Sequence, residues 1–403
     1  MTLAEIPLVL ILAGLGAYLV LAGADFGAGF WDLTARGRGG ARVREHTHRA
    51  MAPVWEANHV WLIFVLVVCW TAYPTAFGSI FSTLFVPLLL AAIGIILRGA
   101  SYAVRSGGEN PTATAVFSAS SIVTPFALGA TIGGIASRRV PTGNAEGDLF
   151  TTWLNPTSIT IGVLAVAASA YLAAVYLAAD AKRTHSVELT RAFRSRALVA
   201  GGVAGALAIA GLAVVRADAE PLFDGLTRGA GLAAVIVSVL GGVATLALVW
   251  RARYEWARFS AALAVAAIVA GWGFGHGSEL LPGLTVQEAA AGDATLEALL
   301  IGIAAGLVLL VPSLFLLYRL VLRGRFDPQD AVEAVPEPGR HVRTTRPGWG
   351  RSAAVVALIA AGVPLTLFAD GVLFALGVVS MLAFIPAAFA LLVSGDTLGE
   401  PGL

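Results

Sequence analysis

The sequence is poor in charged residues and contains almost no cysteine. Only 13% of its 403 residues are charged and 58% are hydrophobic, and this charged fraction is about half of that in soluble domains. The single cysteine, Cys69, excludes an internal disulfide and any Cys-x-x-Cys motif for a metal or a covalently attached haem. A formal net charge of +1 gives no reason to expect a nucleic acid partner.

Long hydrophobic runs are what the sequence has instead. Runs of about 20 residues recur along the chain, and each can cross about 30 Å of hydrocarbon. The sequence therefore predicts an all-α polytopic protein whose surroundings are the lipid bilayer. We predict core spans over residues 6–31, 50–72, 81–104, 113–137, 158–179, 197–215, 230–250, 257–275 and 297–322. Two shorter apolar runs follow at 352–369 and 372–394.

The end of the chain differs from the rest. Residues 324–350 lack apolar periodicity and are typical of a flexible linker. The predicted organisation is a membrane core over 1–323, a cytoplasmic linker over 324–350 and a helical hairpin extension over 351–403. The first run has no basic leader region, so we expect a retained span and not a cleaved signal.

Basic residues are distributed unevenly among the loops. Basic loops of membrane proteins stay cytoplasmic. With the N-terminus outside, the inner segments hold 22 of the 26 Lys and Arg residues. These segments are 32–49, 98–105, 182–196, 251–258 and 319–351. The sequence therefore predicts an outside N-terminus and an inside linker.

Few ionisable residues are expected within the spans. Asp25 lies in the first, Glu56 and His59 lie beside Asn58 in the second, and Arg98 lies in the third. A charged residue at the centre of a membrane helix costs about 2.5–3.5 kcal/mol, so such residues are rarely accidental. At 1.5 Å per residue, antiparallel neighbouring helices place the two acids and the arginine at a similar depth.

Two interpretations of this cluster remain open. Arg98 can form a structural ion pair with one acid and hold three helices together. Because one arginine cannot neutralise two acids, the second acid can instead take part in a proton path from the cytoplasm. Intramembrane acids are also found in secondary transporters, although the inverted repeats of such proteins are not visible in the sequence.

Haem ligands and aromatic residues give a weaker signal. The chain has six histidines and three methionines, and only His59 lies well inside a predicted span. The chain alone therefore cannot provide two axial ligands to each of several haems. Hydrogen bonding is the ordinary role of a lone buried histidine. Trp55 and Trp61 flank Asn58, and they can serve core packing or an oxygen path.

Several stretches carry a resemblance to a known family. The strongest are "APVWEANHVWLI" (52–63), "GADFGAG" (23–29) and "TPFALGATIGGIASRRVPTG" (124–143). Shorter ones, such as "LRG" (97–99) and "WLNPTSI" (153–159), follow in the same order over residues 6–323. In these stretches the chain resembles subunit II of the cytochrome bd quinol oxidases.

The resemblance implies a haem-free subunit of a respiratory complex in a prokaryotic cell membrane. It implies a nine-helix core of two four-helix bundles and a peripheral helix. The partner, subunit I, would carry the b- and d-type haems and the quinol site. The complex would oxidise quinol, reduce dioxygen to water and draw protons from the cytoplasm. No catalytic residue or metal ligand is then expected in this chain, and the resemblance links Glu56 to proton delivery and Trp61 to an oxygen route.

The chain also departs from the family pattern. Ala22 occupies a position at which many relatives carry a second acid, so a proton path would use other groups here. The extension over 324–403 is not part of the family core, and our hypothesis is that it replaces a small accessory subunit. A purely structural scaffold remains an alternative function for the whole chain.

Overall fold

The computed structural model describes residues 2–37, 39–51, 55–106, 111–277 and 279–322, together with short stretches between 357 and 383. For residues 51, 55–57, 103–106, 111–113, 318 and 321–322 it describes the backbone alone. The chain divides into two units, Met1–Phe326 and Asp327–Leu403.

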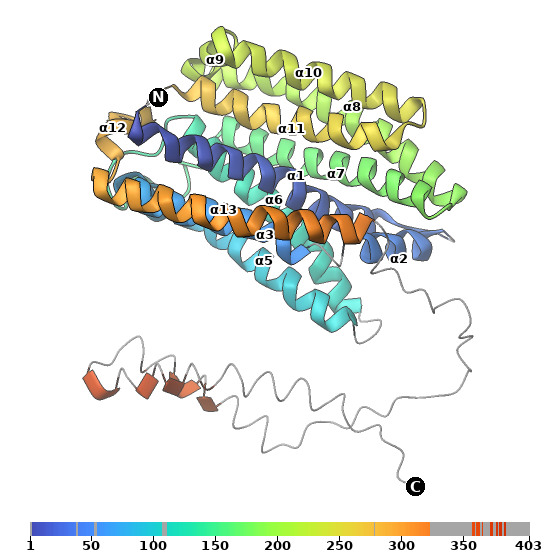
Figure 1. Ribbon diagram of the computed structural model, residues 1–403, viewed down its shortest axis with the longest axis horizontal. Helices are drawn as coiled ribbons and strands as arrows, with labels where there is room; N and C mark the ends of the chain where they lie inside the picture. Colours follow the sequence, from blue (N-terminus) through green and yellow to red (C-terminus); the bar gives the residue numbers. More distant parts are fainter. Residues whose placement is uncertain are drawn as a thin grey trace. The chain divides into compact units, whose positions relative to one another are not determined.

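The first unit is almost entirely helical (Figure 1), which confirms the predicted all-α class. In its described residues a short 3-10 helix, η1 (Leu3–Glu5), precedes thirteen α-helices, and β1 (Glu279–Leu281) pairs with β2 (Leu284–Thr285) in an antiparallel hairpin. The helices are α1 (Ile6–Thr34), α2 (Gly40–Met51), α3 (Trp55–Ala72), α4 (Pro74–Thr83), α5 (Phe85–Ser106), α6 (Pro111–Ala136), α7 (Pro156–Arg183), α8 (Val187–Asp218), α9 (Glu220–Leu226), α10 (Gly229–Trp250), α11 (Tyr254–His276), α12 (Val286–Ala289) and α13 (Asp293–Leu322).

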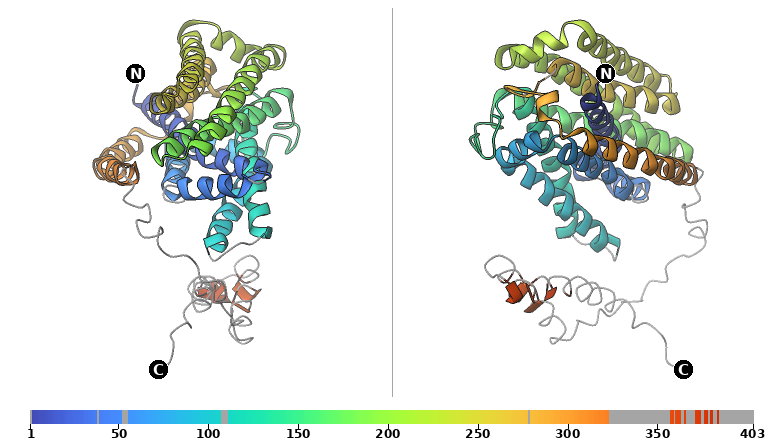
Figure 2. Two further views of the ribbon diagram at one scale, coloured as in Figure 1. Left: turned by 90° about the vertical axis from the view of Figure 1, so that its right-hand side faces the viewer. Right: turned by 60° about the vertical axis from the view of Figure 1, so that its left-hand side comes forward.

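Helices α1 and α7 lie at the centre of this unit. Helix α1 packs against α3, α6, α7 and α11, whereas α7 packs against α6 and α8 as well. Figure 2 shows this arrangement from two further sides. Much of the core around α7 is built from small side chains, among them Ala173, Ala174 and Ala178, which are fully buried. Such residues let helix backbones approach closely, which favours association in lipid.

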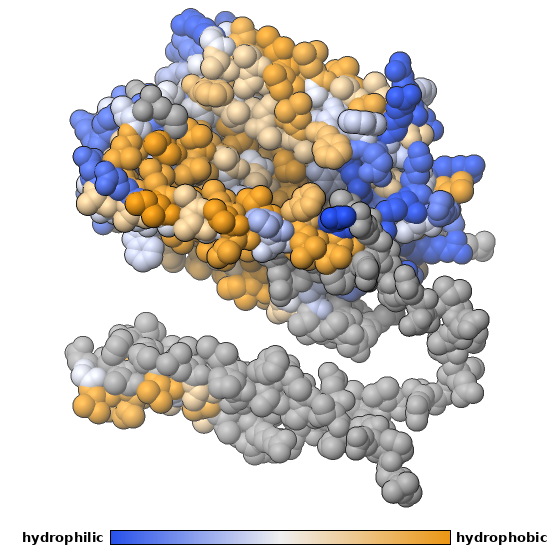
Figure 3. Space-filling model, in the orientation of Figure 1, coloured by the Kyte–Doolittle hydropathy of each residue, from blue (hydrophilic) through white to orange (hydrophobic). Residues whose placement is uncertain are grey.

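Within the residues that the structure describes, eight helices are long and apolar enough to cross a membrane, and the shorter apolar stretch Asn58–Ala72 adds a candidate for the second span. Figure 3 shows hydrophobic residues over the middle of the first unit and hydrophilic ones toward its two ends. The chain is thus a multi-pass membrane protein. The arrangement as two four-helix bundles and a peripheral helix stays a prediction, although α13 has no buried residue in its most apolar window.

The second predicted span, 50–72, is placed differently in the structure. Its first residues belong to α2, a separate polar helix that ends at Met51, and α3 begins at Trp55. The polar sequence "GARVREHTHRAM" explains the separate helix. Two of its buried side chains, Val43 and Thr47, are one turn apart, so α2 presents one face to the core and the other to the aqueous side.

Polar contacts join one end of the core. Asp218 at the end of α8 accepts two hydrogen bonds from the Arg139 guanidinium, at 2.7 and 3.0 Å, and one from the Thr157 hydroxyl at 2.6 Å. Asn155 caps the first turn of α7 by accepting from the Ser158 N–H at 2.9 Å. In the same connection, hydrogen bonds from the backbone N–H groups of Thr151 and Phe150 hold the pKa of the Asp148 carboxyl below its usual range. Side-chain contacts therefore order the connection between α6 and α7.

The opposite end collects basic segments from distant parts of the sequence. The Arg42 guanidinium of α2 donates to the Glu188 carboxylate at the start of α8, at 2.5 Å. The Lys182 ammonium at the end of α7 donates to the carbonyl of Ala252, in the turn between α10 and α11, at 3.0 Å. Three of the segments predicted to face the cytoplasm are thus joined at one end of the core.

The second unit contains the predicted hairpin extension. Its described residues lie between 357 and 383, and the Ser380 hydroxyl donates to the carbonyl of Leu358 at 2.8 Å. The predicted linker 324–350 lies outside the described residues, as does most of the predicted hairpin 351–403. Both assignments stay predictions.

Candidate functional site

The structure brings Asp25 of α1 and Arg98 of α5 together in the interior. Both side chains are fully buried. The guanidinium binds both carboxylate oxygens, with Nε 3.0 Å from Oδ2 and Nη2 2.9 Å from Oδ1. Nη2 also donates to the backbone carbonyl of Asp25 at 2.7 Å. Two-point binding of this kind is the strong form of an arginine–carboxylate contact.

Polar and aromatic groups complete the surroundings of Arg98. Its Nη1 donates to the hydroxyl of Ser121 on α6, and the Tyr102 hydroxyl donates to Asp25 Oδ1 at 3.3 Å. The guanidinium carbon lies 4.1 Å from the ring centre of Phe117 and 5.1 Å from that of Phe26. Ring faces attract cations in a site without water, so these contacts help a charged group to persist in the membrane interior.

The glycines of "GADFGAG" make room for this pair. A Cβ on Gly29 would overlap the Ser121 side chain and lie 3.0 Å from Arg98 Nη1. A Cβ on Gly27 would overlap the backbone carbonyl of Ser169 on α7. The motif is therefore a packing element, because its small residues let α1 approach both the arginine and the central helix.

His59 lies next to this cluster, on α3. Its Nδ1 is 3.4 Å from the Tyr18 hydroxyl, and the ring lies 5.9 Å from that of Phe26. The neighbouring Asn58 is buried, and its amide donates to the carbonyl of Leu21 on α1 at 3.3 Å. His59 and Asn58 thus connect α3 to the same stretch of α1 that carries Asp25.

Of the other predicted residues of α3, the structure describes the side chain of Trp61 but only the backbone of Trp55 and Glu56. Trp61 packs against the buried cluster of Tyr18, Ala22 and Phe26. Its indole N–H is buried and has no hydrogen-bond acceptor among the described residues. The backbones of Trp55 and Glu56 belong to α3, and their side chains lie outside the described part of the chain.

Sequence reasoning missed a second buried acid and its neighbours. Asp32 is almost fully buried on α1, and together with Thr47 and His48 of α2 it lines a small void. The His48 ring stacks on Tyr102, with centroids 5.5 Å apart, and Tyr102 in turn contacts Asp25. Asp32 follows Asp25 by two helical turns, so the spacing was a signal that these acids share a face of α1. The described residues contain no group of three or more His, Cys, Asp or Glu side chains able to hold a metal ion.

Comparisons with known proteins agree on one family. A family model for cytochrome bd terminal oxidase subunit II matches residues 3–321. A candidate cytochrome bd menaquinol oxidase subunit II of Bacillus subtilis (strain 168) is 21% identical over 333 residues, which is 76% of this chain and 92% of that protein. The fold is similar to a chain of the bd oxidase from Geobacillus thermodenitrificans, with a TM-score of 0.64 and 26% identity over 80% of this chain and 99% of that chain.

Proposed function

Because the chain belongs to the cytochrome bd terminal oxidase subunit II family, we propose that it is a haem-free subunit that assists proton delivery to its partner. It is a subunit of a quinol oxidase complex in the cell membrane, and the complex implies a partner subunit I. We assign the b- and d-type haems to that partner, where they supply electron transfer and the chemistry of dioxygen. This chain would stabilise subunit I and provide part of the path for protons.

The observation that carries the proposal is the buried polar chain around Asp25. The Arg98 guanidinium binds both oxygens of the Asp25 carboxylate, so the positive charge of Arg98 is balanced by one acid. Glu56 precedes His59 by three residues on α3, so the two share a face one turn apart. Glu56 is therefore an acid that Arg98 is not needed to balance, and we propose that it takes up and releases the proton.

The roles of the other residues follow from their contacts. The ion pair of Asp25 and Arg98 fixes α1 against α5. His59 has the Tyr18 hydroxyl as a hydrogen-bond partner, and we propose that His59 is the next group after Glu56 in the proton path.

Other parts of the proposal concern location and the extension. The basic residues that gather at one end of the core favour a cytoplasmic position for that end and an outside N-terminus. We propose that the extension 324–403 covers a site that a small accessory subunit would otherwise take. For Trp61, whose indole contacts α1 residues and has no acceptor for its N–H among the described residues, packing or an oxygen route remains a proposal.

Purification through a tag on this chain tests the proposed assembly. We expect a second large membrane subunit to co-purify from the native membrane, with the absorption band of haem d. The chain expressed without that partner should contain no stoichiometric haem in its reduced-minus-oxidised spectrum. A haem-loaded isolated chain, or a native preparation without haem d, would overturn the assignment.

A further inference from the structure

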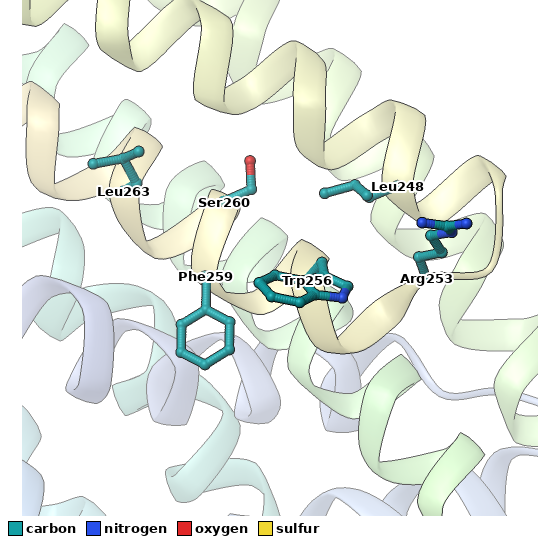
Figure 4. Close-up of a pocket in the computed structure, with 6 residues that line it drawn as sticks. All are labelled: Leu248, Arg253, Trp256, Phe259, Ser260 and Leu263. Atoms are coloured by element: carbon teal, nitrogen blue, oxygen red, sulfur yellow. The ribbon is translucent and has the colours of Figure 1, made fainter.

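An open groove runs between the end of α10 and the beginning of α11, remote from Asp25 in the sequence and unused by the proton path. Its volume is about 460 Å³. Figure 4 shows its six lining residues: Leu248 on α10, Arg253 in the turn, and Trp256, Phe259, Ser260 and Leu263 on α11. The groove has a polar rim at one end and apolar side chains along the rest of its length, so it suits an amphipathic molecule.

The order of these residues follows the depth of a lipid leaflet. Arg253, Trp256, Ser260 and Leu263 recur every three or four residues, so they share one face of the helix. Leu263 follows Arg253 by ten residues, a rise of about 15 Å, which is half of a hydrocarbon core of about 30 Å. A phospholipid fits this order. Its phosphate would lie at the cation on the membrane surface, its glycerol esters at the interfacial tryptophan, and its acyl chain along the aliphatic side chains below.

Close helix packing forms the floor of the groove. The Ser260 hydroxyl donates to the carbonyl of Gly241 at 2.8 Å, and a Cβ on Gly241 would lie 3.1 Å from that of Ala264. Trp256 and Phe259 stand at the surface instead, with about two thirds of each side chain exposed, and their rings lie 6.4 Å apart. The helices therefore touch through small residues, while large apolar groups are left for lipid.

The charges around the turn leave two arginines, Arg251 and Arg253, without a partner among the described residues. Lys182 donates to the carbonyl of Ala252, and Arg194 donates to that of Trp250, so both are bound to the end of α10. Glu255 is the acid nearest to the turn in the sequence, and Arg258 balances it at a distance of 3.5 Å. Both guanidinium groups are exposed, and Arg253 is the one that lines the groove. The rim of the groove is therefore positive.

We propose that this groove binds a phospholipid of net negative charge, with its phosphate on Arg253 and an acyl chain along Trp256 and Leu263. A quinone is neutral and would make no use of the unpaired guanidinium. A net negative lipid is preferred over a zwitterionic one, because juxtamembrane basic residues attract anionic lipids. This site depends on the turn being at a membrane surface, and neither the proton path nor the orientation of the chain is needed for it.

Lipid titration of the purified oxidase complex tests the site. The complex is first delipidated, and phosphatidylglycerol or phosphatidylcholine is then added. Native mass spectrometry counts the molecules of each lipid that bind. Arg253→Gln should lower the affinity of one phosphatidylglycerol molecule about fivefold, the effect of one basic residue near an anionic head group. Arg191→Gln removes an equal charge from an exposed position on α8, and it should leave that affinity unchanged within about twofold.

A second variant separates the charge from the groove. Leu248→Trp keeps Arg253 and fills the apolar space, so it should weaken the retention of both lipids at this site. Equal affinities of the wild-type complex for the two lipids would contradict the proposal. Equal losses in Arg253→Gln and Arg191→Gln would reduce it to a general surface charge, and loss of a bound quinone instead of a lipid would assign the groove to a different ligand.

Discussion

At the scale of residues, the buried pair of Asp25 and Arg98 has two separable properties. As an ion pair it holds α1 to α5, and as a polar group in the membrane interior it belongs to the proposed proton path. Removing one member leaves the other buried and uncompensated, at a cost of about 3–5 kcal/mol. We therefore expect Arg98→Leu and Asp25→Leu each to lower the yield of assembled complex and the temperature at which its haem absorbance is lost.

The double variant distinguishes the two properties. Replacing a whole buried pair by apolar residues is often neutral in stability, so Asp25→Leu with Arg98→Leu should assemble better than either single variant. If Asp25 also tunes proton transfer, oxygen uptake per assembled complex should remain low in that double variant. Recovery of both assembly and turnover would make the pair a structural contact alone.

The depth of a residue along its helix could be predicted from the sequence. The neighbouring helix that its side chain faces could not. Counting 1.5 Å per residue placed Asp25 and Arg98 near one another, and they form an ion pair. The aromatic partners were not predicted, because which face Tyr102 or Tyr18 presents depends on how each helix packs. Nothing in the local sequence marks Tyr102 as the residue that contacts both Asp25 and His48.

At the scale of elements, the contact of α1 with α7 depends on Gly27. A Cβ at this position would overlap the carbonyl group of Ser169 and lie 2.8 Å from the Ala173 Cβ. Because that obstacle includes helix backbone, Gly27→Ala should separate the two helices and destabilise the complex by about 1–3 kcal/mol. The measurement is the midpoint of thermal loss of the haem spectrum in the purified complex.

Gly16 provides the matched control in the same helix. A Cβ on Gly16 meets no atom within 4 Å, and alanine has the higher helix propensity. We expect Gly16→Ala to leave the midpoint unchanged or to raise it slightly. Equal destabilisation by both substitutions would refute the view that the close approach at Ser169 is what requires glycine.

Most helices could be predicted from hydrophobic runs, and their ends could not. The seventh predicted span, 230–250, nearly coincides with helix α10 (Gly229–Trp250), because a tight turn precedes the helix and another follows it. The sixth, 197–215, is the apolar part of α8, which begins ten residues earlier at Val187. Hydropathy detects the part of a helix that lies in lipid, so a polar helical extension such as the start of α8 is invisible to it.

At the scale of the whole molecule, the account makes a prediction about topology. In a variant without Cys69, a cysteine replacing Glu146 should react with a membrane-impermeant maleimide added outside intact cells. A cysteine replacing Thr184 should react only after the membrane is opened, as should one placed near His341. Both Glu146 and Thr184 are exposed in the structure, so protection would report the side of the membrane and not burial. The reverse labelling pattern would invert the orientation.

The central claim is that this subunit carries protons for the oxygen chemistry of the complex. Its most direct test is steady-state oxygen uptake per assembled complex after Glu56→Gln, with assembly checked by subunit stoichiometry and haem content. Because glutamine cannot transfer a proton, uptake should fall about tenfold or more, and Glu56→Asp should have a milder effect. Glu146→Gln, which makes the same change in an outer loop, should have none. Wild-type turnover in a fully assembled Glu56→Gln complex would contradict the claim and leave the subunit a structural scaffold.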